Sequence, residues 1–521
     1  MFAFGENHGD EAGRGEDPLL IMRHIRDDAV DELVIVMDGS YQRADWLLEE
    51  IRRAPGDACA WFSENRCTEG ILTARYFDHL SELIRKPHLL DLHAAAGDGG
   101  HDRSIFPFNQ PDVLPPLLPA QVRQRTALFL HNSYYHFNHL SDGLKQRGWE
   151  TLTVSVESPQ SASQQFYHGE DMNLFDPDPA VMDQKLSAFF QTVPERFGAM
   201  HFYGSGNASF NPRSFERSAR PTQLPWDFLE LRRHRTVIGY MPSGCMDGGL
   251  QSSVRDLTGG LCSKCVWEKR PDVCSDALNG AWNRKLLHIC DWIGLEADLA
   301  TTERVTPKTV YGPVATAIDA ARWSPGIDVS ADMRIDRAPD EILIYHAVGN
   351  YQARRHGGRD IKGTGAVFAA IERLKQEGLP VRLIFAHDIP SSHVRFLQVQ
   401  ADIVVDQLNY GRYGANAREA MMLGRPTICR LDANQAAPQS PLRAIADAPL
   451  IDADEDSLHE RLRELVLHRE LRDMFGARAR KYAVAWFSSD ACAARYERVI
   501  ERIREGLPPE AEELYPHDWA D

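Results

Sequence analysis

The residues best suited to chemistry lie in one stretch, ADIVVDQLNYGRYGANAREAMMLGRPTI at 401–428. It predicts a short apolar strand, a loop with Gly411 and Gly414, a helix that carries Glu419, and a further strand. Loop glycines let backbone N–H groups approach a phosphate, and the dipole at the start of a helix favours its charge. A carboxylate one turn into the helix can accept hydrogen bonds from sugar hydroxyls. The stretch therefore predicts a site for an anion beside a sugar.

The same stretch resembles the donor-nucleotide site of retaining GT-B glycosyltransferases of the family 4 type. Two pieces, Glu419-Ala420-Met421 and Gly424-Arg425-Pro426, match the second half of the family pattern. The first half begins with another glutamate, which would fall at Gly411 and is absent. A glycine and an aromatic residue there also resemble a variant found in bacterial members. The resemblance covers roughly residues 122–505 and is strongest over 341–430.

In the family, a Lys-Gly pair and a basic loop residue grip the donor diphosphate. Lys362-Gly363 match the pair, whereas Arg354, Arg355 and Arg359 all qualify by position for the loop residue. Positive charge is needed there because the leaving nucleotide diphosphate becomes more negative; a solvated basic loop is the alternative interpretation. The resemblance thus implies a donor site made of Arg354, Arg359, Lys362, Gly363, Gly411, Tyr413, Gly414, Ala415, Asn416 and Glu419, in which Glu419 holds the ribose hydroxyls.

The residues implied in catalysis are His201, Lys362 and Glu419. His201 lies in the apolar segment AMHFYG, at a strand end where the family often carries a histidine facing the donor sugar. A core or capping role for this histidine is the alternative interpretation. Candidates for the acceptor site lie at two other predicted strands: His131 and Asn132 end one of them, and Asp247 follows the other.

Four of the nine cysteines form a cluster in the sequence, at Cys245, Cys262, Cys265 and Cys274. Four thiolates are the ligand set of a structural zinc site, and the metal could order this Gly-, Ser- and Asp-rich stretch. An iron–sulfur cluster uses the same ligands and stays open as an alternative, as do four unrelated thiols. Glycosyl transfer itself requires no cofactor, because basic side chains and a helix N-terminus can stabilise the leaving group.

Two α/β series must position these residues. In the first, strands are predicted at 126–133, 151–156, 198–204, 236–241 and 291–296, and a helix at 136–150. In the second, strands are predicted at 341–349, 381–387, 402–407 and 425–431, and a helix at 364–378. Two such series predict an α/β protein of the GT-B fold, with two Rossmann-like domains facing a cleft.

The expected boundaries divide the chain into four parts. They are an N-terminal extension of unknown role with a proline-rich linker at 1–120, an acceptor domain at 121–330 with a cysteine-rich insertion at 245–274, a nucleotide-sugar donor domain at 331–483, and a crossover helix with its tail at 484–521.

Composition excludes some functions. With 521 residues and a net charge of −17, the chain is a poor match for nucleic acid, whose phosphates require clustered Lys and Arg. It has no apolar run of about 18 residues, so no membrane span is expected. The acidic N-terminus does not resemble a signal peptide, and an odd cysteine count fits a reducing compartment. We therefore expect a cytoplasmic protein; its oligomeric state is not predicted.

The resemblance implies an enzyme of polysaccharide or glycoconjugate biosynthesis. It would move a hexosyl or related unit from a UDP- or GDP-sugar, with retention of configuration, to a glycan, a lipid-linked glycan or a small molecule. One alternative is a nucleotide-sugar 2-epimerase or hydrolase of the same fold. Another is a non-catalytic domain that binds a glycan or protein partner, which the glycine at position 411 leaves open.

Overall fold

The computed structural model describes most of the chain from residue 125 onward and four short strands before it. The described residues are 2–3, 19–23, 32–36, 69–72, 125–130, 135–160, 170–203, 231, 234–242, 249–257, 262, 265–280, 286, 290–295, 308–349, 351, 360, 362–433, 436–437, 440–517 and 519. The first four segments are strands β1 (Phe2–Ala3), β2 (Leu19–Arg23), β3 (Glu32–Val36) and β4 (Glu69–Leu72), which pair in this order as an antiparallel sheet.

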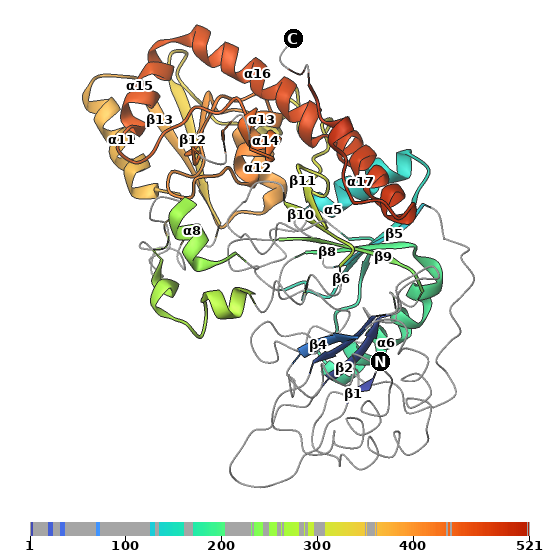
Figure 1. Ribbon diagram of the computed structural model, residues 1–521. Coiled ribbons are helices and arrows are strands. Elements are labelled where there is room, and N and C mark those ends of the chain that lie inside the picture. The colour runs from blue at the N-terminus through green and yellow to red at the C-terminus, as the bar shows by residue number, and fades with distance from the viewer. Residues whose placement is uncertain are drawn as a thin grey trace.

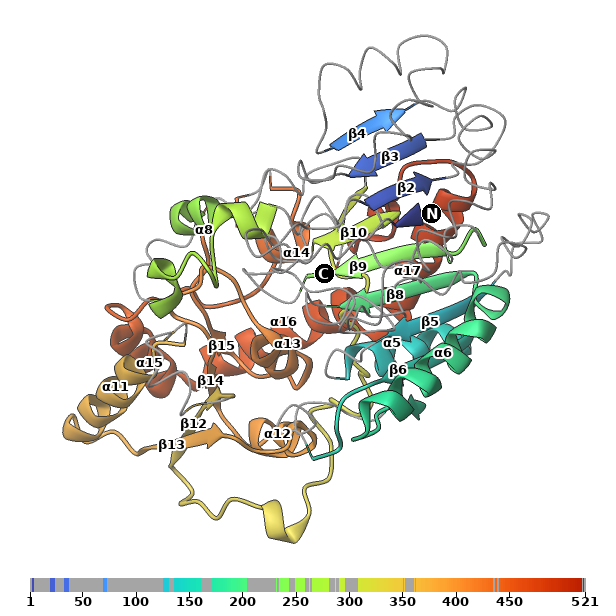
Figure 2. The ribbon, with the colours of Figure 1, turned by 90° about the horizontal axis from the view of Figure 1, so that it is seen from below.

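The first α/β domain is built on a seven-stranded sheet in the order β11-β10-β9-β8-β5-β6-β7, in which every pair is parallel. Its strands are β5 (Thr126–Leu130), β6 (Glu150–Ser155), β7 (Met172–Asn173), β8 (Ala199–Tyr203), β9 (Val237–Met241), β10 (Trp292–Leu295) and β11 (Thr309–Tyr311). The described helices are α5 (His136–Gln146), α6 (Pro179–Arg196) and α8 (Gln251–Leu257), and a 3₁₀ turn lies at Val266–Lys269. Figure 2 shows β10, β9, β8, β5 and β6 side by side.

The second domain has a four-stranded parallel sheet in the order β13-β12-β14-β15. Its strands are β12 (Ile342–Val348), β13 (Val381–His387), β14 (Ile403–Val405) and β15 (Thr427–Ile428). Its helices are α11 (Thr364–Gln376), α12 (Ser391–Gln398), α13 (Ala415–Met422), α14 (Arg443–Ala446), α15 (Leu458–Leu467) and α16 (Arg469–Phe487). The central strands β12 and β14 are almost wholly apolar because helices cover both faces of a parallel sheet.

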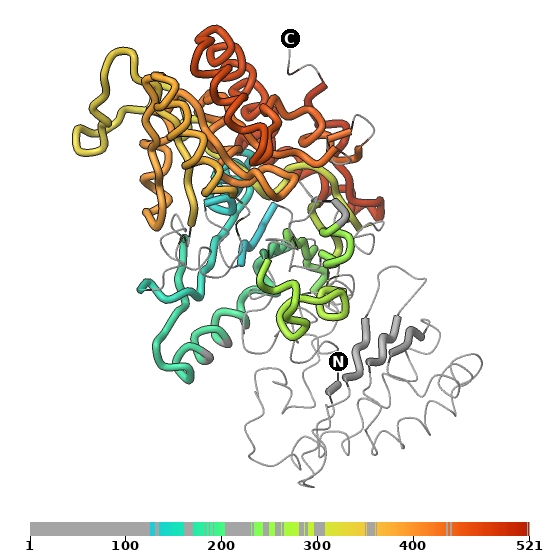
Figure 3. The backbone as a smooth tube through the Cα atoms, turned by 90° about the vertical axis from the view of Figure 1, so that its left-hand side faces the viewer, coloured from blue at the N-terminus to red at the C-terminus, as the bar shows by residue number. Residues whose placement is uncertain are grey.

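The last long helix, α17 (Ser489–Arg504), returns to the first domain. It follows α16 after a single residue, Ser488, and lies against α5 (Figure 1). Tyr496 and Ile500 of α17 join a core cluster with Phe129 and Leu140, so the helix completes the first domain's core. Figure 3 shows the orange part of the chain in the second body, with the red C-terminal part extending from it toward the first.

Helix α13, which carries Glu419, is fixed at its C-terminal end by Gly424. This glycine has φ +69°, a left-handed conformation that ends helices, and the N–H of Arg425 bonds to the carbonyl of Ala420 at 2.9 Å. A Cβ on Gly476 of α16 would lie 2.5 Å from the Gly424 carbonyl, so the two helices meet through glycine. Among the described residues, no helix is long and apolar enough to cross a membrane.

Candidate functional site

The candidate site lies where β12 and β14 end and where α11 and α13 begin. The carboxyl ends of parallel strands meet at one edge of a sheet, which is where ligands bind in folds of this type. Lys362 precedes α11, and Asp406 directly follows β14. Gly414 is the N-cap residue of α13, and Glu419 lies one turn into that helix.

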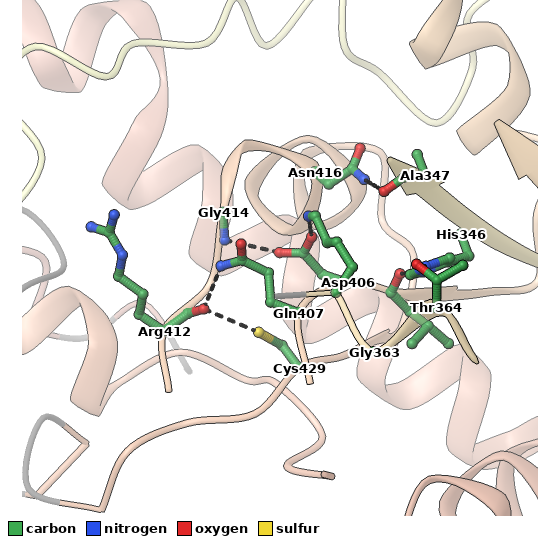
Figure 4. Close-up of polar contacts among 12 residues, drawn as sticks. His346, Ala347, Gly363, Thr364, Asp406, Gln407, Arg412, Gly414, Asn416 and Cys429 are labelled. Carbon is green, nitrogen blue, oxygen red and sulfur yellow. Dashed lines mark hydrogen bonds and ion pairs between the residues drawn. The ribbon is translucent and has the colours of Figure 1, made fainter. Parts of the chain in front are cut away.

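A buried ion pair lies at the centre of this edge. The Lys362 ammonium contacts Oδ1 of Asp406, whose side chain is fully buried, while the Lys362 side chain is 11% exposed. The other oxygen, Oδ2 of Asp406, accepts the backbone N–H of Gly414 at 2.9 Å (Figure 4). One carboxylate thus joins the two segments that the sequence implicates in diphosphate binding.

His346 of β12 connects this strand to β14 and α11. Its Nδ1 lies 3.0 Å from the Val405 carbonyl of β14, and its Nε2 lies 3.0 Å from Oγ1 of Thr364 in α11. Burial lowers the pKa of this histidine to about 4, so it is neutral at physiological pH. A neutral ring with one donor and one acceptor nitrogen fits these two partners.

The Lys-Gly pair needs its glycine. Gly363 has φ +67°, in the left-handed region, and a Cβ there would lie 2.9 Å from the Leu408 side chain. Its N–H bonds to Oδ1 of Asp360 at 2.8 Å, so this carboxylate caps the start of α11. Asp360 thus already accepts the amides of Gly363 and Thr364, and the groups that we consider for an anionic ligand are Lys362 and the start of α13.

Glu419 makes a contact between the two domains. Its Oε1 accepts a hydrogen bond from the Tyr135 hydroxyl at 2.5 Å, and Tyr135 is the N-cap residue of α5 in the first domain. Both side chains are buried. Burial raises the pKa of Glu419 to about 7 despite the Tyr135 hydrogen bond and the charge of Arg418, which lower it. Oε1 is thus engaged within the protein, and Oε2 is the oxygen that could accept a ribose hydroxyl.

The start of α13 differs in detail from the sequence-based prediction. Gly414 was expected to offer its N–H to a diphosphate, but Asp406 already accepts it. Ala415 and Asn416 are half-buried, and amides in the first turn of a helix have no partner within that helix. The Asn416 side chain donates to the Ala347 carbonyl at 3.5 Å (Figure 4). Its Oδ1 accepts a hydrogen bond from Nε2 of Gln398 at 3.0 Å. The backbone N–H groups of Ala415 and Asn416 are therefore what the start of α13 can offer to an anionic ligand.

Two predicted donor-site residues, Gly411 and Tyr413, make contacts within the protein. Gly411 has φ +72°, and its carbonyl accepts the N–H of Asp432 at 2.7 Å. The Tyr413 side chain is 4% exposed, lies in the core with Phe487, and places its hydroxyl 3.3 Å from that of Tyr482. The loop sequence turns this aromatic ring inward, so it is a core residue and its side chain does not line a ligand site.

His201 also lies in a core. It belongs to β8, is completely buried, and packs against Phe137, Trp292 and Tyr496 with ring centroids 5.3, 4.8 and 5.9 Å away. Neither ring nitrogen has a hydrogen-bond partner among the described residues, and burial lowers its pKa to about 3. This placement does not support the catalytic role expected from the resemblance, because the ring packs against side chains of α5 and α17 inside the core.

The described cysteines do not support the zinc prediction. Cys262 and Cys265 form a turn in which the Cys265 N–H bonds to the Cys262 carbonyl at 2.9 Å, and Cys274 accepts a contact from Asn279 at 3.8 Å. In the part of the chain that the structure describes, no group of three or more His, Cys, Asp or Glu residues could hold a metal ion. The fourth predicted ligand, Cys245, is outside the described residues.

Several other predicted residues also fall outside the described ones. They are the arginines Arg354, Arg355 and Arg359 and the acceptor candidates His131, Asn132 and Asp247. Conversely, sequence reasoning missed Asp406, Tyr135 and His346. Asp406 and His346 carried a signal, since both follow or end apolar strands at the edge where ligands bind. Tyr135 carried none, because its partner lies 284 residues away in the sequence.

Two parallel α/β domains joined by a returning C-terminal helix form the GT-B fold, as the sequence predicted. Among solved structures, HepE from Anabaena, determined with UDP and glucose, matches 74% of this chain and all of its own at 10% identity, with a TM-score of 0.43. Sucrose-phosphate synthase from Thermosynechococcus elongatus matches 74% of this chain and all of its own at 13% identity and a TM-score of 0.46. The lipopolysaccharide glycosyltransferase WaaG matches 72% of this chain and 99% of its own at 13% identity and a TM-score of 0.41.

No protein-family model and no curated protein matches the chain by sequence. Identities of 10 to 13% say nothing about donor or acceptor.

Proposed function

We propose that this protein transfers a sugar from a nucleotide-sugar donor to an acceptor hydroxyl with retention of configuration. The observation that carries the proposal is the convergence of Lys362, the start of α13 and Glu419 at one edge of the second sheet. These groups come from segments that the sequence alone had singled out, and the buried Asp406 links two of them directly.

In this proposal the diphosphate lies against Lys362 and the amides of Ala415 and Asn416. The positive charge of Lys362 and the partial positive charge of the two amides stabilise the leaving group as its bond to the sugar breaks. Glu419 accepts a ribose hydroxyl through Oε2 and fixes the nucleotide. The acceptor hydroxyl attacks the sugar carbon from the side on which the diphosphate departs, so the configuration is retained.

Nucleotide binding is the first test. Calorimetry with UDP, GDP and ADP should find at least one ligand, and Lys362→Ala should weaken it by about 1 to 3 kcal/mol, the range of charge-assisted hydrogen bonds. Lys375→Ala is the matched control, since it removes the same charge from the exposed far end of α11. Equal affinity in wild type and Lys362→Ala would place the diphosphate elsewhere.

Turnover is the second test. Incubation with the matching nucleotide sugar and a pool of acceptors should give transfer, and Glu419→Gln should lower its rate at least about tenfold. A competing proposal is a non-catalytic domain, which the internal neutralisation of Lys362 by Asp406 favours. Nucleotide binding without transfer or hydrolysis would support that alternative, and donor turnover without any acceptor would indicate an epimerase or hydrolase.

A further inference from the structure

Asp406 lies at the edge of the second sheet where ligands bind in folds of this type. It is completely buried, and its two oxygens have different partners, the Lys362 ammonium and the Gly414 N–H. A buried charge survives only when it is paired and hydrogen-bonded. Asp406 therefore depends on both segments, and both segments depend on it for their relative position.

The geometry leaves Lys362 available for a ligand. A lysine ammonium has three N–H donors, and Asp406 accepts one of them. The Lys362 side chain keeps 11% of its surface exposed, whereas Asp406 keeps none. A lysine stem is flexible, and immobilising it on binding costs entropy. An ammonium already held by Asp406 has lost that freedom before a ligand arrives.

The loop that follows cannot supply such a carboxylate. The family pattern has a glutamate at the place of Gly411, but φ here is +72°, a conformation that L residues with side chains rarely adopt. The Gly411 carbonyl is also tied to the N–H of Asp432. The carboxylate beside Lys362 in this chain comes from the end of β14.

We propose that Asp406 is a positioning residue of the donor site, which holds the Lys362 ammonium and the first turn of α13 in the arrangement that receives a nucleoside diphosphate. This inference rests on the proposed function. It predicts that Asp406 matters for the phosphates of the ligand and not for its nucleoside, because in the proposed function Lys362 and the start of α13 bind the phosphates, whereas Glu419 binds the ribose.

The test compares UDP with uridine, or the matching pair if the protein prefers another base, by calorimetry on the full chain. Asp406→Asn should weaken the diphosphate at least about tenfold and leave the nucleoside within about twofold. Asp402→Asn is the matched control. Asp402 sits at the other end of β14 and likewise holds a cation and an amide, Arg337 at 2.8 Å and the Leu343 N–H at 2.8 Å, but far from the site. It should leave the ratio of the two affinities unchanged.

A folded Asp406→Asn variant that binds both ligands as the wild type does, or loses both equally, would overturn the proposal. If this variant does not fold, Asp406→Glu replaces it, since it keeps the charge and shifts the ammonium; it should weaken the diphosphate selectively. A measurement on the wild type supports either variant: nitrogen NMR of lysine ammonium groups should show one slowly exchanging signal, absent in Lys362→Met, that moves on addition of UDP but not of uridine. A signal indifferent to UDP would also overturn the proposal.

The two proposals fail in different ways. Wild-type protein that binds none of UDP, GDP and ADP would refute the proposed function, and the role of Asp406 with it. Wild-type protein that binds a diphosphate with the same affinity after Asp406→Asn would refute the role of Asp406 alone.

Discussion

One buried titratable side chain in each domain invites comparison, because burial shifts the two pKa values in opposite directions. His201 in the first domain lies among aromatic rings without a hydrogen-bond partner among the described residues, and its pKa is lowered to about 3. Glu419 in the second domain accepts a hydrogen bond from Tyr135 and lies near the charges of Arg418, Asp406 and Lys362, and its pKa is raised to about 7. Burial favours the neutral form of both groups. Only Glu419 is placed where a change of charge could serve a ligand.

The largest expected effect concerns the buried ion pair of Lys362 and Asp406 in the second domain. Lys362→Met leaves Asp406 as a buried charge without its ion-pair partner, so the free energy of unfolding should fall by about 3 to 5 kcal/mol in urea titrations. The double variant Lys362→Met with Asp406→Asn should recover part of this loss because it removes both charges. A single variant that costs under about 1 kcal/mol would show that the pair is not a coupled unit.

His201 should give the first domain acid sensitivity. The unfolded chain binds a proton near pH 6.5, whereas the folded protein binds it only near pH 3, so stability is lost as the pH falls from about 6.5 toward 3. Each pH unit in that window should cost about 1.4 kcal/mol. His201→Leu should reduce this slope in the urea midpoints, and nucleotide affinity should not change. A slope of the same sign should remain above about pH 4, because the pKa of His346 is also lowered, to about 4. A slope as steep in His201→Leu as in the wild type would contradict the neutral, buried histidine.

Glu419 should produce a slope of the opposite sign. Its pKa is raised from 4.5 to about 7, so the folded state holds the extra proton and this contribution to stability is lost as the pH rises through that window. Glu419→Gln should flatten the slope between about pH 5 and 7. Under the proposed function, nucleotide affinity should rise as the carboxylate ionises, and calorimetry at pH values around 7 should detect the rise in wild type but not in Glu419→Gln.

The smallest effect concerns two buried tyrosines near Glu419. Tyr135→Phe removes the hydrogen bond between the domains and should cost about 1 kcal/mol of stability. Tyr345→Phe is the control, because the Tyr345 hydroxyl is buried without a partner among the described residues, and its removal should leave the stability unchanged or raise it. Equal losses in the two variants would mean that the Tyr135 contact contributes nothing specific.

The fold could be predicted because apolar runs mark parallel strands directly. The runs at 341–349 and 402–407 correspond to β12 and β14, and glycines mark the ends of α11 and α13. Short strands escaped prediction: β7 has two residues and β11 has three. Such pieces gain their structure from pairing with neighbours and have no pattern of their own.

The candidate site could be predicted only where local sequence determines it. The roles of Lys362 and Glu419 stay predictions; the structure places both residues at the candidate site, and each lies at a fixed distance from a glycine and a helix start. The structure buries His201 and Tyr413 in cores, and local sequence could not show this. A side chain on a strand or loop can face a core or a ligand, and the partners that decide this are distant in sequence. Tyr135 could not be found, since its role depends on how two domains meet.

The return of α17 to the first domain has a consequence for synthesis on the ribosome. Arg147 and Glu497, whose side chains meet beside α5, are separated by 350 residues. At roughly 5 to 20 residues per second, about 20 to 70 seconds pass between the emergence of α5 and that of its cover. During this interval the apolar face formed by Phe137, Leu140 and Leu144 has no α17 to bury it. A nascent chain of this protein should therefore need chaperone protection late in translation, and premature termination before α17 should yield an aggregation-prone product even though every strand of both sheets has been made.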